Sequence, residues 1–383
     1  MKNNIDIKLR GLSLFANVGV AEAYMEELGV KMEMANEVIP ERARFYQDVY
    51  PSTHMIQGDI TDDIVRSEII REAKEKKVNF VMATPPCQGM SRVGKMEEFD
   101  VRNQLIYYAV DVIKRLNPEF VLIENVTTIL KTKILVDGQI MVIPDYLKKE
   151  LGDNYTFNKE SKVKAMYYSI PQMRLRNIYL LVRKDKKVIW EFPEHTHIVN
   201  LREAIGNLPP VDPELREGMA LTLEKFPYFE KRKRAALKIS KWHQPPKLSW
   251  KLVECMMHTP TNQSATTNPV YYPKKSNGVR VKAHYNQYRR LSWDTPSRCL
   301  TQNNGVISSL ACVHPGRPYK KDGETLYTDP RVFTIYEIMI ISSLPLNWPI
   351  PDWANDTLIR RVIGEGIPSK LIKVIMEVLI KQL

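Results

Sequence analysis

The stretch LRGLSLFANVGVAE, from Leu9 to Glu22, decides the fold class, because it joins an apolar strand to a glycine turn and the start of a helix. Strand and helix patterns keep alternating up to about residue 130. Strands are expected at 30–38, 53–60, 78–84 and 119–126, and helices at 21–29, 40–50, 64–77 and 103–118. This alternation predicts βαβ units around a parallel sheet, and therefore an α/β fold.

The ends of these strands carry a glycine turn and several acidic residues. Ligands of such sheets bind at the carboxyl ends of the strands, so these residues should share one rim. Glu37, after the second strand, could accept from ribose hydroxyls, and Asp59, after the third, from an adenine amino group. Together they predict a ligand that contains adenosine. The chain has no G-x-x-x-x-G-K-[ST] pattern, which argues against a phosphate-binding loop.

A cysteine follows two prolines at the end of the fourth strand, in FVMATPPCQGMS, residues 80–91. Pro85 and Pro86 each fix their own φ angle and restrict the residue before them. The turn that carries Cys87 should therefore be rigid before any substrate binds. A buried structural cysteine would not need this mounting, whereas a nucleophile that meets a flat ring at a fixed angle would.

The composition is that of an ordinary globular protein, with 44% hydrophobic and 26% charged residues in a chain of 383. The N-terminus lacks a signal-peptide pattern, and no apolar run reaches the length of a membrane span. The four cysteines form no C-x-x-C pair, so a metal site is not expected. These features favour a reducing cytoplasm.

The positive charge is concentrated in one segment. Residues 231–290 contain fourteen Lys or Arg and a single acidic residue, whereas the whole chain carries a formal net charge of +12. Aromatic residues such as Trp242, Tyr272 and Tyr285 are interleaved with the cations. A solvated basic face would explain a scattered excess, but a segment that carries the entire net charge predicts a surface for a polyanion.

Several sequence blocks occur in the order found in one enzyme family. PPCQGMS, LIENV and QMRLR follow the LFA…G turn, and RRLSWDTPSRCLTQ, RVFTIYEI and VIGEGIP come later. In this order the blocks resemble those of the DNA (cytosine-5)-methyltransferases, over nearly the whole chain except about 195–285. The resemblance implies a Rossmann-like, S-adenosylmethionine-dependent domain with a smaller, irregular target-recognition domain.

The resemblance also implies roles for individual residues. Cys87 would add to carbon 6 of a flipped cytosine, and Glu124 would engage ring nitrogen 3 and the exocyclic amine. Arg176 would hold the base carbonyl, and Arg174 would hold a phosphate or brace the cysteine loop. The residues expected to bind S-adenosylmethionine are Phe15, Ala16, Asn17, Gly19, Glu37, Asp59, Ile60, Pro86 and Leu105. Those expected to bind DNA are Gln88, Ser91, Arg289 and Arg290, the last two within YNQYRR.

Two positions depart from the family's pattern near the cofactor turn. Asn17 stands where the family usually has Gly, and Ser13 where it usually has Asp. In the last block Glu365 replaces the usual Asn, so the cofactor contact from that block is an open question. Asn accepts positive φ angles better than most residues, which allows the turn to survive.

The leading prediction is a DNA cytosine-5 methyltransferase of restriction–modification type, a monomer that acts on double-stranded DNA beside a separate restriction endonuclease. Residues 1–195 would form the catalytic domain and 196–290 the target-recognition domain. Residues 291–383 would return, and their last helix would complete the catalytic domain. A tRNA cytosine-5 methyltransferase of the same fold, or an inactive nucleic-acid-binding relative, would be the alternatives; the long basic insert favours duplex DNA.

Overall fold

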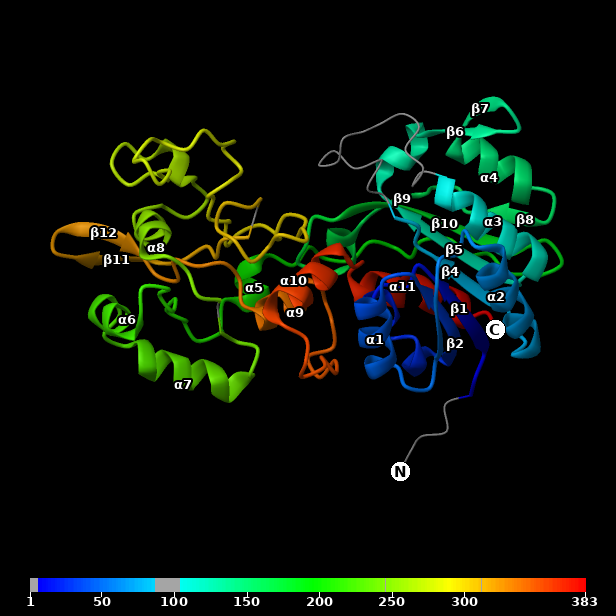
Figure 1. The fold of residues 1–383 in the computed structure, drawn as a ribbon, viewed down its shortest axis with the longest axis horizontal. Helices are drawn as coiled ribbons and strands as arrows, with labels where there is room; N and C mark the ends of the chain where they lie inside the picture. The colour runs from blue at the N-terminus through cyan, green and yellow to red at the C-terminus, as the bar shows by residue number, and fades with distance from the viewer. Residues whose placement is uncertain (1–5, 87–103, 245, 311) are drawn as a thin grey trace.

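A computed structural model describes residues 6–86, 104–244, 246–310 and 312–383 of the chain. Two bodies make up the molecule (Figure 1). The larger one contains the central sheet and both ends of the chain, and the smaller one contains the middle of the sequence. None of the helices within the described ranges is long and apolar enough to cross a membrane.

The large body is built on an eight-stranded sheet in the order β3-β2-β1-β4-β5-β10-β8, with β9 paired to β10. The first five strands are mutually parallel, whereas β10 runs antiparallel to β5, β8 and β9. Their bounds are β1 Leu9–Leu14, β2 Val30–Glu37, β3 His54–Gln57, β4 Phe80–Ala83, β5 Phe120–Asn125, β8 Tyr155–Phe157, β9 Lys162–Lys164 and β10 Leu175–Arg183. The predicted parallel α/β sheet is therefore confirmed.

The alternation of side chains along each strand separates two apolar cores. Val81 and Val121 lie in one core and Phe80 and Phe120 in the other, because successive strand residues point to opposite faces. The first face is covered by α2 Asp63–Glu75, α3 Leu105–Leu116 and α4 Ile143–Leu151. The second face is covered by α11 Ser369–Ile380, so the end of the chain returns to the sheet where it began.

The segment after the glycine turn differs from the prediction. A helix was expected at 21–29, but the chain forms two short 3₁₀ turns, η1 Val20–Glu22 and η2 Glu26–Leu28. Gly29 ends the second turn in a left-handed conformation. The full-length helix follows β2 instead, as α1 Pro40–Val49 with proline in its first turn, as the sequence predicts.

The small body has its own apolar core, which runs from Leu215 to Val332. The sequence shows no clear periodicity up to about residue 290, yet this part of the chain forms several short helices, and a hairpin follows later. They are α6 Met219–Lys225, α7 Phe229–Ile239, α8 Trp250–Met257, η6 Ala265–Thr267, β11 Pro318–Lys321 and β12 Glu324–Tyr327. Because the hairpin packs with α8, this core extends well past the predicted boundary at residue 290.

Short connecting elements lie between the two bodies in Figure 1. They are α5 Leu201–Ile205, α9 Ile335–Ile341 and α10 Asp356–Glu365, which share a third core with α1. The remaining elements belong to the large body and are η4 Thr127–Lys131, β6 Lys133–Val136, β7 Gln139–Val142 and η5 Ala165–Tyr168.

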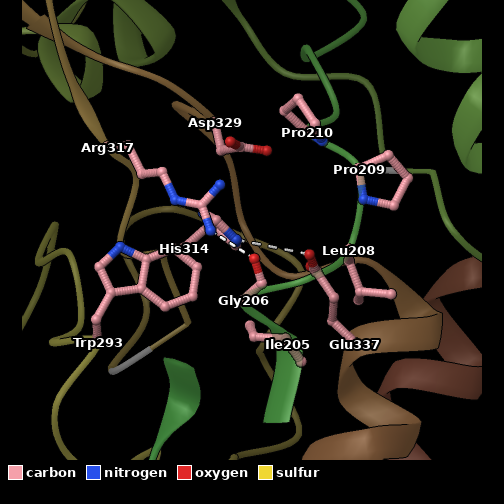
Figure 2. A pocket seen from close by; sticks show the side chains of 10 residues that line it. All are labelled: Ile205, Gly206, Leu208, Pro209, Pro210, Trp293, His314, Arg317, Asp329 and Glu337. Atoms are coloured by element: carbon pink, nitrogen blue, oxygen red, sulfur yellow. Dashed lines mark hydrogen bonds and ion pairs between the residues drawn. The ribbon is translucent and has the colours of Figure 1, made fainter. Parts of the chain in front are cut away.

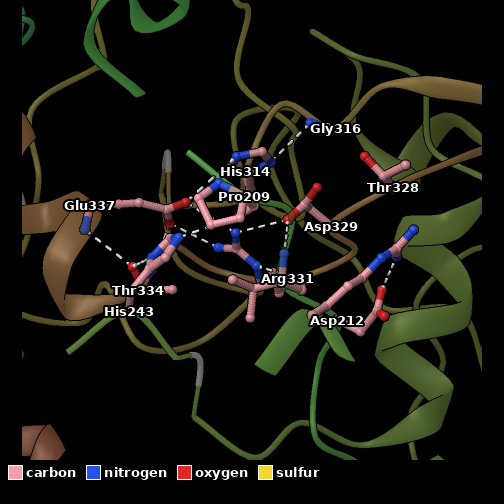
Figure 3. A network of polar contacts seen from close by, with 12 residues as sticks. Pro209, Asp212, His243, His314, Gly316, Thr328, Asp329, Arg331, Thr334 and Glu337 are labelled. Carbon is pink, nitrogen blue, oxygen red and sulfur yellow. Dashed lines mark hydrogen bonds and ion pairs between the residues drawn. The ribbon is translucent and has the colours of Figure 1, made fainter. Parts of the chain in front are cut away.

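A buried polar network joins the small body to α9 (Figure 3). Arg331 donates two hydrogen bonds to the Glu337 carboxylate, at 2.8 and 3.0 Å, and a third to Asp329 at 2.8 Å. His314 lies 3.7 Å from Glu337, and burial lowers its pKa to about 4, so it is neutral near pH 7. All four side chains are nearly inaccessible to solvent, and every charge in the network has an opposite charge beside it.

A small pocket lies next to this network, lined by Trp293, His314, Arg317 and neighbouring residues (Figure 2). Its volume is only about 10 Å³, room for roughly one water molecule. Arg317 crosses it to donate to the carbonyl oxygen of Gly206. The pocket is therefore a packing gap between the bodies rather than a ligand site.

Candidate active site

The strand order reverses between β1 and β4, and this places two predicted motifs side by side. From β1 the chain moves outward through β2 and β3, then returns to β4 on the other side of β1. The Thr84 hydroxyl donates to the carbonyl of Phe15 at 3.1 Å, which ties the end of β4 to the glycine turn. Such a switch point is where ligands bind in open α/β sheets.

The glycine turn has an unusual backbone that its residue types permit. Phe15, Asn17 and Gly19 have φ angles of 59°, 51° and 76°. A Cβ on Gly19 would lie 2.2 Å from the Tyr50 ring, so only glycine fits at this position. Glu37 supports the turn, because its carboxylate accepts from the backbone N–H of Asn17 at 2.9 Å.

The other residues expected at the cofactor surround this turn. Ala16 and Ile60 are buried, whereas Pro86 and Leu105 are partly exposed. The Asp59 side chain is exposed, and its carboxylate accepts from the backbone N–H of Thr61 at 2.9 Å. The predicted set is thus arranged around the carboxyl ends of β1, β2, β3 and β4.

Glu124 and Arg176 form an ion pair at the same end of the sheet. Arg176 Nε lies 2.8 Å from Glu124 Oε1, and both side chains are about nine-tenths buried. Burial raises the pKa of Glu124, although Arg176 and Arg174 oppose that rise. A carboxyl group in this setting can hold a proton more readily than an exposed one and can donate it to a ring nitrogen.

Arg174 connects three distant segments rather than pointing to solvent. Its guanidinium donates to the carbonyl oxygens of Leu300, Gly364 and Glu365, at 3.1, 3.1 and 2.7 Å. Only 2% of the residue is exposed. This burial does not fit a phosphate contact. Arg174 braces the segments at Leu300 and at the end of α10, and its predicted role as a brace of the cysteine loop stays a prediction.

The Pro-Pro turn is held from the neighbouring strand. Asn125 Nδ2 donates to the carbonyl oxygen of Pro85 at 3.1 Å, so the last residue of β5 fixes the chain just before the predicted nucleophile. Cys87, Gln88 and Ser91 themselves lie outside the described residues. Their predicted roles therefore stay predictions.

Sequence reasoning missed one group in this neighbourhood, Cys299. Arg174 Nη1 lies 3.3 Å from its sulfur. Burial alone would raise the pKa of this thiol, but Arg174 and Arg176 together lower it below its ordinary value. The cysteine stands in the RRLSWDTPSRCLTQ block, which follows the segment of about 195–285 that the family resemblance does not cover. Its place in a family block was the available signal.

The predicted DNA contact at Arg290 is wrong. The residue is fully buried, and its guanidinium donates to the carbonyl oxygens of Met256, His314 and Asp329. It therefore ties segments of the small body together and cannot reach a phosphate or base. Arg289 is partly exposed and stacks on the Tyr285 ring at 4.7 Å.

Known proteins resemble this chain over nearly its whole length. The family of C-5 cytosine-specific DNA methylases matches residues 9–381. Type II methyltransferase M1.HgaI of Avibacterium volantium is 39% identical over 378 residues, which cover 97% of each chain. Type II methyltransferase M.Eco47II of Escherichia coli is 26% identical, over 94% of this chain and 76% of its own length.

Two solved structures share the fold at low sequence identity. A putative DNA modification methyltransferase encoded within an E. coli prophage aligns with a TM-score of 0.64 and 19% identity, over 97% of this chain and 98% of the other. Spodoptera frugiperda DNMT2 aligns with a TM-score of 0.58 and 15% identity, over 97% of this chain and 99% of the other.

The matched family spans both cores of the large body and the whole small body, and the 39% identical relative covers the chain almost from end to end. The chain therefore belongs to the C-5 cytosine-specific DNA methylase family and is an enzyme that methylates carbon 5 of cytosine in DNA.

Proposed function

We propose that this enzyme methylates one cytosine within a short, specific sequence of double-stranded DNA, with S-adenosylmethionine as methyl donor and Cys87 as covalent nucleophile. The observation that carries the proposal is the buried Glu124–Arg176 pair beside the braced Pro85–Pro86 turn. The pair offers a proton and hydrogen-bond donors to a flat ring, and the turn directly precedes Cys87 in the sequence. A stacked base must first leave the duplex, at a cost of a few kcal/mol.

The chemistry balances with the residues at this rim. The Cys87 thiolate forms a bond to carbon 6, while Glu124 supplies a hydrogen bond or proton to ring nitrogen 3. Carbon 5 then takes the methyl group, with S-adenosylhomocysteine as the leaving group. Solvent takes the proton from carbon 5, ring nitrogen 3 returns its proton to Glu124, and the bond between carbon 6 and the Cys87 sulfur breaks to release the thiolate and restore the ring. Arg176, already aligned by its bond to Glu124, neutralises negative charge that develops on the base.

The rim suits the cofactor that this chemistry requires. S-adenosylmethionine supplies an electrophilic methyl group when bound. The Phe15 ring is partly exposed next to the glycine turn, as a partner for adenine would be. The side-chain oxygen of Asn17 is buried with no hydrogen-bond partner among the described residues, which leaves an acceptor for a ligand's donor.

The small body supplies the proposed DNA surface. A groove of about 630 Å³ is lined by residues of η6 and of the segment after it, among them Thr266, Arg280, Lys282 and Tyr285. Arg280 stacks on Tyr272 at 3.7 Å, which fixes its guanidinium at the rim of the groove. Cations and aromatic rings on one groove suit a nucleic-acid backbone and its bases.

The resemblance to restriction–modification enzymes also leads us to propose a biological setting. The enzyme would act as a monomer in the bacterial cytoplasm or nucleoid and protect sites from a separate endonuclease. Bisulfite sequencing of DNA from a host that expresses this chain would reveal the methylated sequence. Methylation scattered without any sequence motif would contradict a specific target.

A substitution at Cys87 tests the covalent step. Cys87→Ser should abolish tritium transfer from labelled S-adenosylmethionine while DNA binding in a gel-shift titration survives. Cys255→Ser is the control, because Cys255 is buried in the small body and burial raises its thiol pKa to about 11. Near-normal turnover in Cys87→Ser would remove this residue from the mechanism.

A trapping substrate sharpens the same test. With 5-fluorocytosine at the target position carbon 5 has no proton to lose, so an adduct that resists denaturation should form with the wild type and with Cys255→Ser. It should not form with Cys87→Ser. An active enzyme that forms no adduct would contradict covalent addition.

A further inference from the structure

The first residues of β10 present two apolar side chains at the catalytic rim. Because β10 runs antiparallel to β5, with Asn177 opposite Asn125 at the end of β5, the residues before Asn177 extend beyond that end of the sheet. Met173 and Leu175 lie in this extension and are 37% and 38% exposed. Apolar side chains at the rim of a catalytic centre indicate a contact surface rather than a random exposure.

Alternation along the strand separates the apolar side chains from the catalytic arginines. Arg176 points to Glu124 on one face of the sheet, so Leu175 lies on the other face. Further along β10 this second face is covered, because Tyr179 and Leu181 belong to the first apolar core. The start of β10 therefore offers a polar face to the base and an apolar face to the nucleotides beside it.

Backbone contacts on both sides hold this part of the chain in place. The N–H of Met173 donates to the carbonyl oxygen of Ser297 at 2.7 Å, and the carbonyl oxygen of Arg174 accepts from the N–H of Ala165 at 2.8 Å. The two apolar side chains are thus positioned before any DNA binds, which lowers the entropy that a contact with them would cost.

Two cations flank the apolar pair. Lys164 lies directly opposite Leu175 in the ladder of β9 and β10, so the two side chains share a face. Arg298 is exposed next to Ser297, on the other side of the strand. In the described part of the chain neither cation forms an ion pair with an acidic side chain. Apolar side chains between two uncompensated cations match a DNA strand, whose phosphates are anionic and whose sugars are largely apolar.

Arg298 also lies close to the groove of the small body. Partial burial and the nearby positive charge of Arg289 lower the pKa of Arg298, whereas Tyr285, which lines the groove, opposes this change. Like charges this close repel each other, so an anion beside them is favourable. A duplex that lies in the groove therefore has a cationic path to the catalytic rim.

We propose that four residues form one strip that binds DNA beside the flipped cytosine and stabilises the open base pair. They are Met173, Leu175, Lys164 and Arg298. The two apolar side chains pack on sugar rings and on base edges that are uncovered when the cytosine leaves the stack, and the two cations bind the flanking phosphates. This inference rests on the proposed duplex substrate and its flipped base, and it adds residues to which the sequence assigned no role.

A mismatched substrate tests the apolar pair. The duplex would carry the sequence found by bisulfite sequencing, with the target cytosine opposite either guanine or adenine; the mismatch lowers the cost of flipping. Met173→Ser and Leu175→Ser should each slow single-turnover methyl transfer on the matched duplex about tenfold, because an apolar contact is lost. On the mismatched duplex both should approach the wild-type rate.

A fluorescent base reports the flipping itself. With 2-aminopurine in place of the target cytosine, fluorescence rises when the base leaves the stack, and this rise should be several-fold smaller for the two serine variants. Leu175→Met keeps an apolar side chain and should restore the full rise. Ile189→Ser is the matched control, because Ile189 is 75% exposed beyond the other end of β10, and it should behave like wild type. Thermal unfolding should be unchanged in all variants, since every substituted side chain is exposed.

The cations are tested by salt dependence. Arg298→Gln should reduce the slope of log affinity against log salt by about one unit, as expected for one lost phosphate contact. Lys74→Gln removes the same charge from the last turn of α2, near the start of β4 and away from the rim, and should leave the slope unchanged. Equal slopes for Arg298→Gln and wild type would remove Arg298 from the strip.

The outcomes separate this inference from the proposed function. Wild-type rates on the matched duplex in both serine variants would overturn the strip. Equal losses on matched and mismatched duplexes would also overturn it, since the apolar pair would then act on the chemical step and not on the open base pair. A wild type that binds the duplex without any rise in 2-aminopurine fluorescence would instead contradict base flipping, on which the proposed function depends.

Discussion

At the scale of single residues, Glu124 separates base recognition from cofactor binding. Glu124→Gln keeps the side-chain shape but removes the proton donor and the charge that holds Arg176. We expect turnover to fall by at least about a hundredfold, as is typical when a general acid is lost. S-adenosylmethionine affinity, measured by titration calorimetry, should change little. Glu119→Gln, just before the other end of β5, is the control and should retain activity; a parallel loss of cofactor binding in Glu124→Gln would place Glu124 in the adenosine pocket instead.

A second residue-scale prediction concerns Glu22, buried beneath the glycine turn. It accepts from the Ser13 hydroxyl at 2.6 Å and from Tyr46, and burial raises its pKa from 4.5 to about 7. The folded state therefore holds a proton that the unfolded state releases, so stability falls as pH rises from about 4.5 to 7. Glu22→Gln removes this dependence.

The measurement is urea unfolding of wild type and Glu22→Gln between pH 5 and 8. The difference in unfolding free energy should move in favour of the variant with rising pH, by about 3 kcal/mol at most. The comparison cancels other titrating groups, which both proteins share. A difference that is independent of pH would show that Glu22 is ionised throughout this range.

Single residues also show which positions could be predicted from the sequence and which could not. Glu124 and Arg176 were predictable because each stands in a motif, and their positions at strand ends imply one rim. Arg290 was not, because a basic residue in a basic segment looks the same whether it meets DNA or buried carbonyl oxygens. Only the tertiary fold, which surrounds it with the carbonyls of Met256, His314 and Asp329, decides between the two.

At the scale of elements, α9 begins at a capping box that also carries a buried charge. The Thr334 hydroxyl accepts from the N–H of Glu337, and Glu337 accepts from the N–H of Thr334 and from Arg331. Glu337→Gln leaves Arg331 buried with less compensating charge, and such losses cost about 3–5 kcal/mol. Thermal unfolding should show a clear decrease in stability.

The chain supplies a matched control for this prediction in α5, which begins with the same type of box. There the Asn200 side chain accepts from the N–H of Glu203, and the Glu203 carboxylate accepts from the N–H of Asn200. Glu203 is exposed, and this box includes no buried arginine. Glu203→Gln should cost at most about 1 kcal/mol. Equal effects of the two substitutions would mean that the cap, rather than the buried ion pair, stabilises α9.

The network also predicts the response to acid. Burial would raise the pKa of Glu337, but Arg331 and His314 lower it to about 2. Because the unfolded value is near 4.5, this contribution to stability is present above pH 4.5 and is lost as pH falls toward 2. Glu337→Gln should therefore show a weaker loss of stability than wild type between pH 4.5 and 3.

Elements were predictable where the pattern is strong. The strands of the parallel sheet are apolar runs bounded by helices, and their order along the chain follows directly. The helix expected at 21–29 was wrong because Gly29 closes a second 3₁₀ turn, and the chain reaches β2 without a full helix. The helices α6 to α8 were missed because each is short, and in α7 many basic residues also interrupt the apolar spacing.

At the scale of the whole molecule, the positive charge of residues 231–290 lies at two places on the small body. One is α7, where Arg232 pairs with Asp212 and Lys233 lies 3.7 Å from Glu214. The other is the groove of the segment after η6, on the side of the small body away from α7 (Figure 1). The sequence shows one continuous basic segment. In the structure, Asp212 and Glu214, which lie outside that segment, neutralise part of the charge of α7.

The groove should therefore dominate the electrostatic attraction to DNA. Lys282 is exposed and lines it, so Lys282→Gln should reduce the dependence of log affinity on log salt by about one unit, for cognate and unrelated duplexes alike. Lys238→Gln, an exposed lysine of α7, removes the same charge from the opposite side and should leave the slope unchanged. Fluorescence anisotropy titrations from 50 to about 300 mM salt would measure both slopes. A steeper loss in Lys238→Gln than in Lys282→Gln would mean that DNA approaches the small body along α7, and the groove would then lose its assignment as the DNA surface.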